Sequence, residues 1–267
     1  MSRGAILFAF NSTKVDYYSM AVYTAKRINH FLKIPVTIVT DKNSIPTFSE
    51  YNFDKTIIVE SDPNNTFRND VWLNKGRYRA YELSPYDETL LLDVDYIVNS
   101  DTLLTAFDLV QDYVCHETIA QLMIPDGKNE IVSDTSFPCL WATVILFKKT
   151  KKAKQLFDCM KMVQKNYKHY AYLYQFNADT FRNDFALTIA HRIIHGQLPD
   201  KRNILPWSLN HIWLKTAVIA NNKDPYNTSY TLIYDNWKKN KIKKEYITIT
   251  DTDFHVINKD IFMELIK

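Results

Sequence analysis

Apolar residues occur along the chain in short continuous runs separated by segments with helical spacing. Residues 5–10, 35–40 and 55–59 form such runs, which are typical of strands covered on both faces. Between the first two, residues 17–32 place their apolar side chains three or four positions apart, which predicts a helix. Strand, helix and strand in this order predict βαβ units. We therefore expect an α/β fold with a mostly parallel central sheet flanked by helices.

The same pattern continues to the end of the chain. We expect helices over residues 69–84, 102–110, 149–168 and 183–195, and strands over residues 119–124 and 141–147. Pro85 and Gly196 end two of these helices. No linker, repeat or low-complexity tract divides the chain, so we predict one domain of two lobes, residues 1–112 and 113–267.

The most informative stretch is residues 88–98, ETLLLDVDYIV, which we interpret as a buried strand. Side chains on a strand alternate, so Asp93 and Asp95 are expected on the same side. Two adjacent carboxylates are costly to bury unless a cation compensates them. A divalent cation would take one or both carboxylates and complete its shell with water and phosphate oxygens. We therefore predict a metal at this pair, and a diphosphate on the metal.

Composition restricts how phosphate is bound. Of 267 residues only 4 are glycine, and neither G-x-G-x-x-G nor a P-loop occurs. Phosphate contacts must then come from a metal and from cations such as Lys75 and Arg77 ahead of the acidic stretch. The net charge of +3 is too small to indicate a nucleic-acid partner by itself.

Cysteine usage and hydropathy bear on location. Three widely spaced cysteines form neither a disulfide framework nor a metal motif. No run reaches the ~20 apolar residues of a membrane span, so we expect no span and a cytoplasmic protein. His191 and His195 have the spacing of zinc ligands, but Arg192 stands where a metalloprotease has glutamate, which disfavours zinc there.

The element order, the LLLDVDYIV stretch and the late FHVINK segment resemble GT-A fold glycosyltransferases, especially glycogenin-like and galactosyltransferase-like enzymes. The resemblance implies a manganese (or magnesium) ion bound by Asp93, Asp95 and His255. It implies a lysine, here Lys259, on the diphosphate of a nucleotide sugar, most often a UDP-sugar.

The resemblance also divides the chain by role. It implies a nucleotide-sugar-binding lobe over residues 1–112 and an acceptor lobe over residues 113–267. We place Asn11, Lys75 and Arg77 among the donor-binding candidates and Asp184 as the catalytic candidate near the acceptor. The family's glycine-containing acceptor segment is replaced here by residues 141–143, which leaves the acceptor undetermined.

Other readings stay open. Two lysine clusters, residues 148–154 and 238–244, suit either solubility or a nucleic-acid backbone, so modified DNA bases and glycans are both candidate acceptors. Aromatic residues between 167 and 176 suit either a sugar platform or a core. The rival functions are a non-catalytic nucleic-acid-binding protein and a metal-dependent nucleotidyltransferase or phosphohydrolase.

Overall fold

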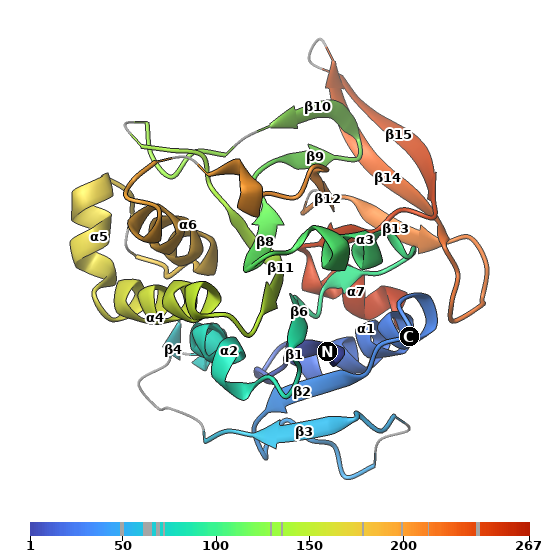
Figure 1. The fold of residues 1–267 in the computed structure, drawn as a ribbon. Helices are drawn as coiled ribbons and strands as arrows, with labels where there is room; N and C mark the ends of the chain where they lie inside the picture. Colours follow the sequence, from blue (N-terminus) through green and yellow to red (C-terminus); the bar gives the residue numbers. More distant parts are fainter. Residues whose placement is uncertain are drawn as a thin grey trace.

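The computed structural model describes residues 1–48, 51–60, 66–67, 70–71, 73–128, 130–134, 136–177, 179–198, 200–212, 214–238 and 241–267. Its centre is a six-stranded sheet in the order β3-β2-β1-β6-β11-β8 (Figure 1). The strands are β1 (Arg3–Phe8), β2 (Val36–Thr40), β3 (Lys55–Ile58), β6 (Glu88–Leu92), β8 (Tyr113–His116) and β11 (Trp141–Lys148). The first four in the sheet order are parallel, and β11 runs antiparallel to both of its neighbours. The predicted α/β class with a mostly parallel sheet is confirmed.

Alternate residues of the central strands supply two separate cores. In β1, Ala5 and Leu7 contribute to one core, and Ile6 and Phe8 to the other. The run of three leucines in β6 divides in the same way. A strand buried on both faces has no polar side to present, which is why its apolar residues are continuous.

Helices cover both faces. On one side lie α1 (Tyr17–Phe31), α3 (Thr102–Leu109) and the last helix, α7 (Lys259–Leu265); α1 and α7 run close together in Figure 1. On the other side lie α2 (Ala80–Leu83), α4 (Lys151–Lys165) and α6 (Asn183–Ile194). The remaining short elements are α5 (Tyr167–Tyr174) and the 3₁₀ helices η1 (Leu73–Arg79) and η2 (Lys201–Asn203).

A second sheet carries the C-terminal segment back to the centre. Its order is β10-β9-β12-β16-β7, with β10 (Ile124–Lys128), β9 (Ile119–Gln121), β12 (Leu209–Ile212), β16 (Phe254–Val256) and β7 (Tyr96–Ile97). Because β7 follows the acidic pair and pairs with β16, residues 93–97 lie beside residues 254–256. A three-stranded sheet of β13 (Ala217–Ala220), β14 (Ser229–Lys238) and β15 (Lys241–Thr250) and a small pair, β4 (Thr66–Phe67) and β5 (Asp70–Val71), complete the fold.

Several predicted elements are confirmed within one to three residues: the helices at 17–32, 102–110, 149–168 and 183–195, and the strands at 5–10, 35–40, 55–59 and 141–147. The helix predicted over residues 69–84 is wrong. Its described part contains β5, then η1 and only four α-helical residues. Gly76 lies in the middle of this segment, and a glycine inside a helix costs ~1 kcal/mol relative to alanine. The strand predicted over residues 119–124 is also shorter and ends at Gln121.

The three cysteines are free, and Cys115 and Cys139 are buried. Among the residues the structure describes, no helix is long and apolar enough to span a bilayer. The division into lobes at residue 112 and the cytoplasmic location stay predictions. Strands β8 and β11, which follow that boundary, belong to the same sheet as β1 and β6.

Candidate active site at the end of β6

The two aspartates lie in a turn and not on a strand. Strand β6 ends at Leu92, and Tyr96 N–H donates to Asp93 O across 3.2 Å to close the turn. Neighbouring strands fix it: Asp93 N–H donates to Thr143 O (3.0 Å) and Val256 N–H to Asp95 O (2.9 Å). The prediction of one continuous strand over residues 88–98 is therefore wrong. The carboxylates converge because the turn is held between β11 and β16.

His255 joins the pair from the other end of the chain. It sits on β16, in register with Tyr96 on β7, and its Nε2 lies 3.1 Å from Asp95 Oδ2. One ligand atom each of Asp93, Asp95 and His255 falls within 4.8 Å of the others, and this is the one such metal-ligand group in the described part of the chain. His255 Nδ1 is buried without a hydrogen-bond partner. Two carboxylate oxygens and an imidazole suit a divalent cation with positions left for water or phosphate.

Two cations flank the acids. Lys259, in the first turn of α7, places its Nζ against Asp95 Oδ2. Arg77 is 2% exposed; its Nη1 contacts Asp93 Oδ1, and its Nη2 donates to Ala142 O (2.6 Å) and Thr143 O (3.3 Å). Arg77 therefore lies behind Asp93, with Nη1 on the turn and Nη2 on β11, while its buried Nε has no hydrogen-bond partner. A direct contact between Arg77 and a nucleotide-sugar donor stays a prediction.

The electrostatics of the two acids differ. Burial alone raises the pKa of Asp95, but Lys259 and His255 outweigh it and hold that pKa well below its usual range. For Asp93, burial together with the negative charge of Asp95 prevails over Arg77, and the pKa is raised. Asp95 therefore stays ionised at neutral pH. Asp93, whose pKa is raised, is the acid whose ionisation changes with the charges placed next to it.

Asp184 is connected to the same site through the backbone of one residue, Ala142. It lies in the first turn of α6, and its Oδ1 accepts from Ala142 N–H (2.8 Å), while Ala142 O accepts from Arg77. Its Oδ2 accepts from Arg182 (3.3 Å), which also pairs with Glu130 (2.8 Å). The structure thus brings Asp184 to the strand beside the acidic turn. Its catalytic role stays a prediction.

The remaining donor candidates lie in the first lobe. Asn11 follows β1, whose carboxyl end is next to that of the parallel strand β6. Its Oδ1 accepts from Tyr18 N–H (2.9 Å), and its N–H donates to Ser44 Oγ (2.6 Å). Asn11 therefore shapes the loop at the sheet edge where ligands of open α/β sheets bind. The side chain of Lys75 lies outside the described residues.

Sequence reasoning missed His211. Strand β12 pairs with β16 so that His211 is opposite His255, with ring centroids 5.7 Å apart. Burial, and then the charge of His255, lower the pKa of His211 to about 4, so its ring is neutral at physiological pH. No spacing in the sequence connects these histidines, because their proximity depends on a parallel pairing across more than forty residues.

Two other predicted clusters have structural roles. His191 and His195 lie within hydrogen-bonding distance of Tyr113 Oη (2.8 and 3.0 Å), and His195 also contacts Asp200 (2.9 Å). In the aromatic cluster, Tyr167 packs in a core with Phe176, whereas Tyr172 is 88% exposed. The described side chains therefore do not form a common aromatic platform.

No family model and no curated protein matches the sequence. Among solved structures, the galactosyltransferase LgtC, crystallised with donor and acceptor sugar analogues, is 12% identical, with a TM-score of 0.44 over 70% of each chain. Mouse xyloside xylosyltransferase 1 is 12% identical, with a TM-score of 0.47 over 74% of this chain and 84% of that one. The glycosyltransferase GlyE of Streptococcus pneumoniae is 14% identical, with a TM-score of 0.41 over 77% of this chain and 45% of that one.

Proposed function

We propose that the protein is a metal-dependent glycosyltransferase that moves a sugar from a nucleotide sugar, a UDP-sugar, to an acceptor hydroxyl. The observation that carries this proposal is the convergence of Asp93, Asp95 and His255, with Lys259 in contact with Asp95. The first three residues are ligands for Mn²⁺ or Mg²⁺, and the lysine is a cation for phosphate oxygens.

The charges of the site favour binding the metal together with the diphosphate. The carboxylates of Asp93 and Asp95 are balanced by Arg77 and Lys259. A lone divalent cation would add two positive charges and compete with Lys259 for Asp95. A nucleoside diphosphate supplies the matching negative charge and gives Lys259 new oxygens to contact. We expect metal and diphosphate to strengthen each other's binding.

In this proposal, the metal supplies Lewis-acid stabilisation of the leaving diphosphate when bound. Lys259 leaves Asp95 and donates to the diphosphate oxygens as negative charge develops on them. Arg77 keeps Asp93 in place from behind. The loop of Asn11 and the segment of Lys75 border the nucleotide. Asp184 accepts a hydrogen bond from a sugar hydroxyl, while Ala142 N–H keeps the Asp184 carboxylate oriented.

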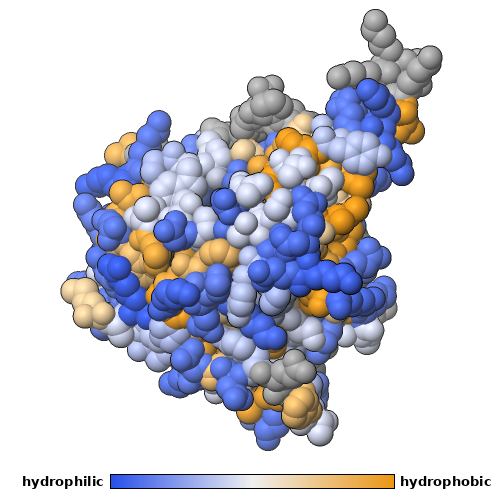
Figure 2. Space-filling view, turned by 90° about the vertical axis from the view of Figure 1, so that its right-hand side faces the viewer, coloured by the Kyte–Doolittle hydropathy of each residue, from blue (hydrophilic) through white to orange (hydrophobic). Residues whose placement is uncertain are grey.

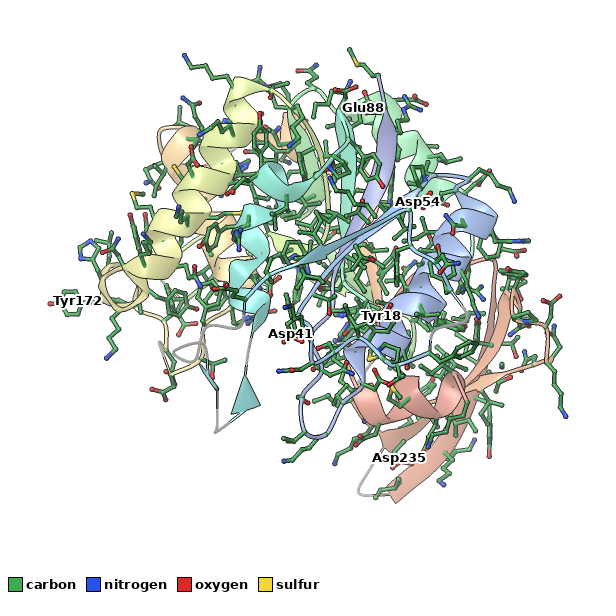
Figure 3. All side chains as sticks on the ribbon, turned by 90° about the horizontal axis from the view of Figure 1, so that it is seen from below. Tyr18, Asp41, Asp54, Glu88, Tyr172 and Asp235 are labelled. Atoms are coloured by element: carbon green, nitrogen blue, oxygen red, sulfur yellow. The ribbon has the colours of Figure 1, made fainter. Side chains whose placement is uncertain are left out.

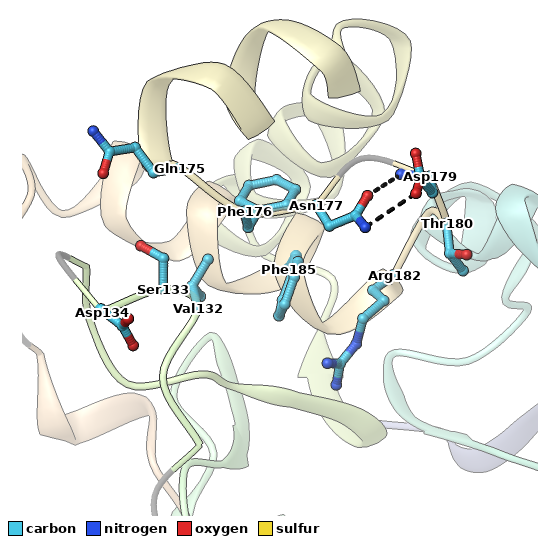
Figure 4. A pocket seen from close by; sticks show the side chains of 10 residues that line it. All are labelled: Val132, Ser133, Asp134, Gln175, Phe176, Asn177, Asp179, Thr180, Arg182 and Phe185. Atoms are coloured by element: carbon cyan, nitrogen blue, oxygen red, sulfur yellow. Dashed lines mark hydrogen bonds between the residues drawn. The ribbon is translucent and has the colours of Figure 1, made fainter.

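A hollow of about 440 Å³ bears on the acceptor, because Arg182, which pairs with Asp184, is one of the residues that line it. Figure 4 shows Ser133 and Asp134 on one side, Phe176 and Asn177 on another, and Arg182 at the edge. The charged side chains of its lining are Asp134, Asp179 and Arg182, and Arg182 already pairs with Glu130 and Asp184. This balance repels a polyanion and suits a neutral hydroxyl-bearing group, so we propose a glycan acceptor ahead of DNA.

Donor hydrolysis tests the function. With Mn²⁺ and UDP-sugars but no acceptor, the protein should slowly release UDP and free sugar, and Asp95→Asn should abolish this release. Asp260→Asn is the matched control, because it removes an exposed carboxylate from the helix that carries Lys259. Donor sugars that bind should also raise the melting temperature. Release of inorganic phosphate would indicate a phosphohydrolase. DNA binding with no turnover would indicate a non-catalytic binding protein.

A further inference from the structure

The three-stranded sheet ends on a long strand that is paired on one side only. In the order β13-β14-β15, strand β15 (Lys241–Thr250) lies at the edge and pairs with β14 along its full length. None of the residues that the structure describes pairs with the other side of β15. Figure 1 shows this strand along the outer margin of the molecule, away from the central sheet. A row of backbone N–H and C=O groups is therefore available to another strand.

The register of the hairpin divides the side chains of β15 between two faces. Ile249 is buried opposite the buried Tyr230, so the odd-numbered residues of β15 belong to the inner face and the even-numbered ones to the outer face. On the outer face Ile242 and Tyr246 are 55% and 66% exposed. Figure 2 shows hydrophobic and hydrophilic surface side by side along the projecting hairpin. A strand added at the free edge would cover both apolar side chains.

The described charges at this edge are balanced. Lys244 on the outer face lies opposite Asp235 on β14. Lys243 and Glu245 lie on the inner-face side, each opposite a neutral residue of β14. Hydrogen bonds from neutral side chains of β14 leave the charge of Glu245 in place. Lysines on an edge strand oppose pairing, so a strand that pairs here must bring an acid to Lys243 and a lysine to Glu245.

We propose that the free edge of β15 pairs antiparallel with the same edge of a second copy of this chain, about a two-fold axis at Lys244. The two sheets of three strands then form one continuous antiparallel sheet. In this register Glu245 of each copy lies opposite Lys243 of the other, and Ile242 of each copy lies opposite Tyr246 of the other. The symmetry therefore forms each ion pair and each apolar pair twice.

Charge complementarity selects a second copy as the partner. Among the described side chains of this edge, Lys243 and Lys244 are matched in number by Asp235 and Glu245, so a polyanion finds no excess of positive charge. The two Lys244 residues meet at the axis, which is unfavourable, but an Asp235 lies next to each of them. A register centred on Glu245 would instead place two glutamates face to face and leave Lys243 without an acid. The proposal rests on the sheet alone and does not depend on the reaction.

Sedimentation velocity of the full chain tests the dimer. We expect a monomer–dimer equilibrium between about 2 and 200 µM, where the dissociation constants of small interfaces lie. Glu245→Lys sets lysine against lysine and Lys243→Glu sets acid against acid, so each variant should raise the dissociation constant by about 30-fold. An equimolar mixture of these two variants restores opposite charges in every pair and should dimerise like the unchanged protein. Tyr246→Ser should raise the dissociation constant by about tenfold.

A disulfide tests the register. Lys244→Cys places two thiols face to face at the axis, where paired strands have the Cα separation of about 4.4–6.8 Å that a disulfide needs, so oxidation should give a covalent dimer. Thr248→Cys is exposed on the same face of β15 but lies far from the axis, and it should stay uncrosslinked. The unchanged protein controls for the partly exposed Cys159.

Two variants control for surface changes elsewhere. Lys154→Glu reverses an exposed charge on α4, and Tyr172→Ser removes an exposed aromatic side chain from α5. Figure 3 shows Tyr172 on α5 and Asp235 on the hairpin at opposite sides of the molecule. Both variants should dimerise like the unchanged protein, and circular dichroism should show all variants folded.

Three results would overturn the proposal. One is a monomer at every concentration in this range. Another is a dimer that the hairpin variants leave intact, or that the mixture of Glu245→Lys and Lys243→Glu fails to restore. The third is an oxidised Lys244→Cys variant that forms no more covalent dimer than Thr248→Cys.

Discussion

Replacing Arg77 by methionine should both destabilise the fold and make metal binding dependent on pH. Arg77 is buried, and its guanidinium holds the Asp93 carboxylate and two β11 carbonyls. Removing one partner of a buried ion pair costs ~3–5 kcal/mol. The Asp93 side chain is 23% exposed, so water recovers part of this energy, and we expect a loss of about 3 kcal/mol in the free energy of unfolding.

The pH dependence follows from Asp93, which loses its ion-pair partner in the Arg77→Met variant. Burial already raises the pKa of Asp93 above its ordinary value of 3.8, and loss of Arg77 raises it further. In the unfolded chain this carboxyl is ionised above about pH 4. Between these two pKa values the folded variant binds more protons than the unfolded chain, so its stability falls as pH rises. The difference in the free energy of unfolding between the variant and the unchanged protein should therefore be larger at pH 8 than at pH 5.

Urea unfolding at the two pH values measures this difference in the free energy of unfolding. Calorimetric titration with Mn²⁺ and UDP measures the affinity for the metal. Because a metal needs the ionised carboxylate, the variant should bind Mn²⁺ more weakly at pH 5 than at pH 8, beyond the change in the unchanged protein. Asp93→Asn combined with Arg77→Met should recover part of the stability and none of the metal binding. A loss below 1 kcal/mol in Arg77→Met, or a difference independent of pH, would refute the reasoning.

Three further outcomes are expected. Mn²⁺ should bind more tightly in the presence of UDP than alone, by about tenfold or more in calorimetric titration, and equal affinity would contradict the balanced charges of the site. Burial, and then His195, lower the pKa of His191 to about 4 from 6.5, so stability should fall as pH decreases from 6.5 to 4 by up to about 3 kcal/mol, and His191→Gln should flatten that slope in urea unfolding. Gly4→Ala should lower the free energy of unfolding by about 1–3 kcal/mol, because a Cβ at position 4 would lie 2.4 Å from the buried ring of Tyr86; unchanged unfolding would show that this ring can shift.

Much of the fold follows from local pattern. The leucines of β6 and the apolar run of β1 predict buried strands because residues facing either core must be apolar. The helices α1, α4 and α6 are predicted because their buried residues recur with helical spacing. In contrast, the β14–β15 hairpin is not predicted, since its lysine-rich outer end hides the alternation of its inner face.

The site is predictable in composition but not in geometry. Asp93 and Asp95 are identified by spacing, yet strand alternation is the wrong reason for their proximity. That proximity depends on the backbone hydrogen bonds from Asp93 N–H to Thr143 O and from Val256 N–H to Asp95 O. Those bonds join segments that are about fifty and a hundred and sixty residues away. His211 could not be found for the same reason.

The contact through Ala142 is made by its backbone alone: its N–H binds Asp184 and its C=O binds Arg77. This backbone contact places no constraint of its own on the side chain, so any residue whose side chain fits the buried site of Ala142 in the core would keep the coupling between α6 and the acidic turn. Sequence comparison at this position therefore records little about the chemistry beside it. Only proline, which lacks the N–H, would be forbidden there on this ground.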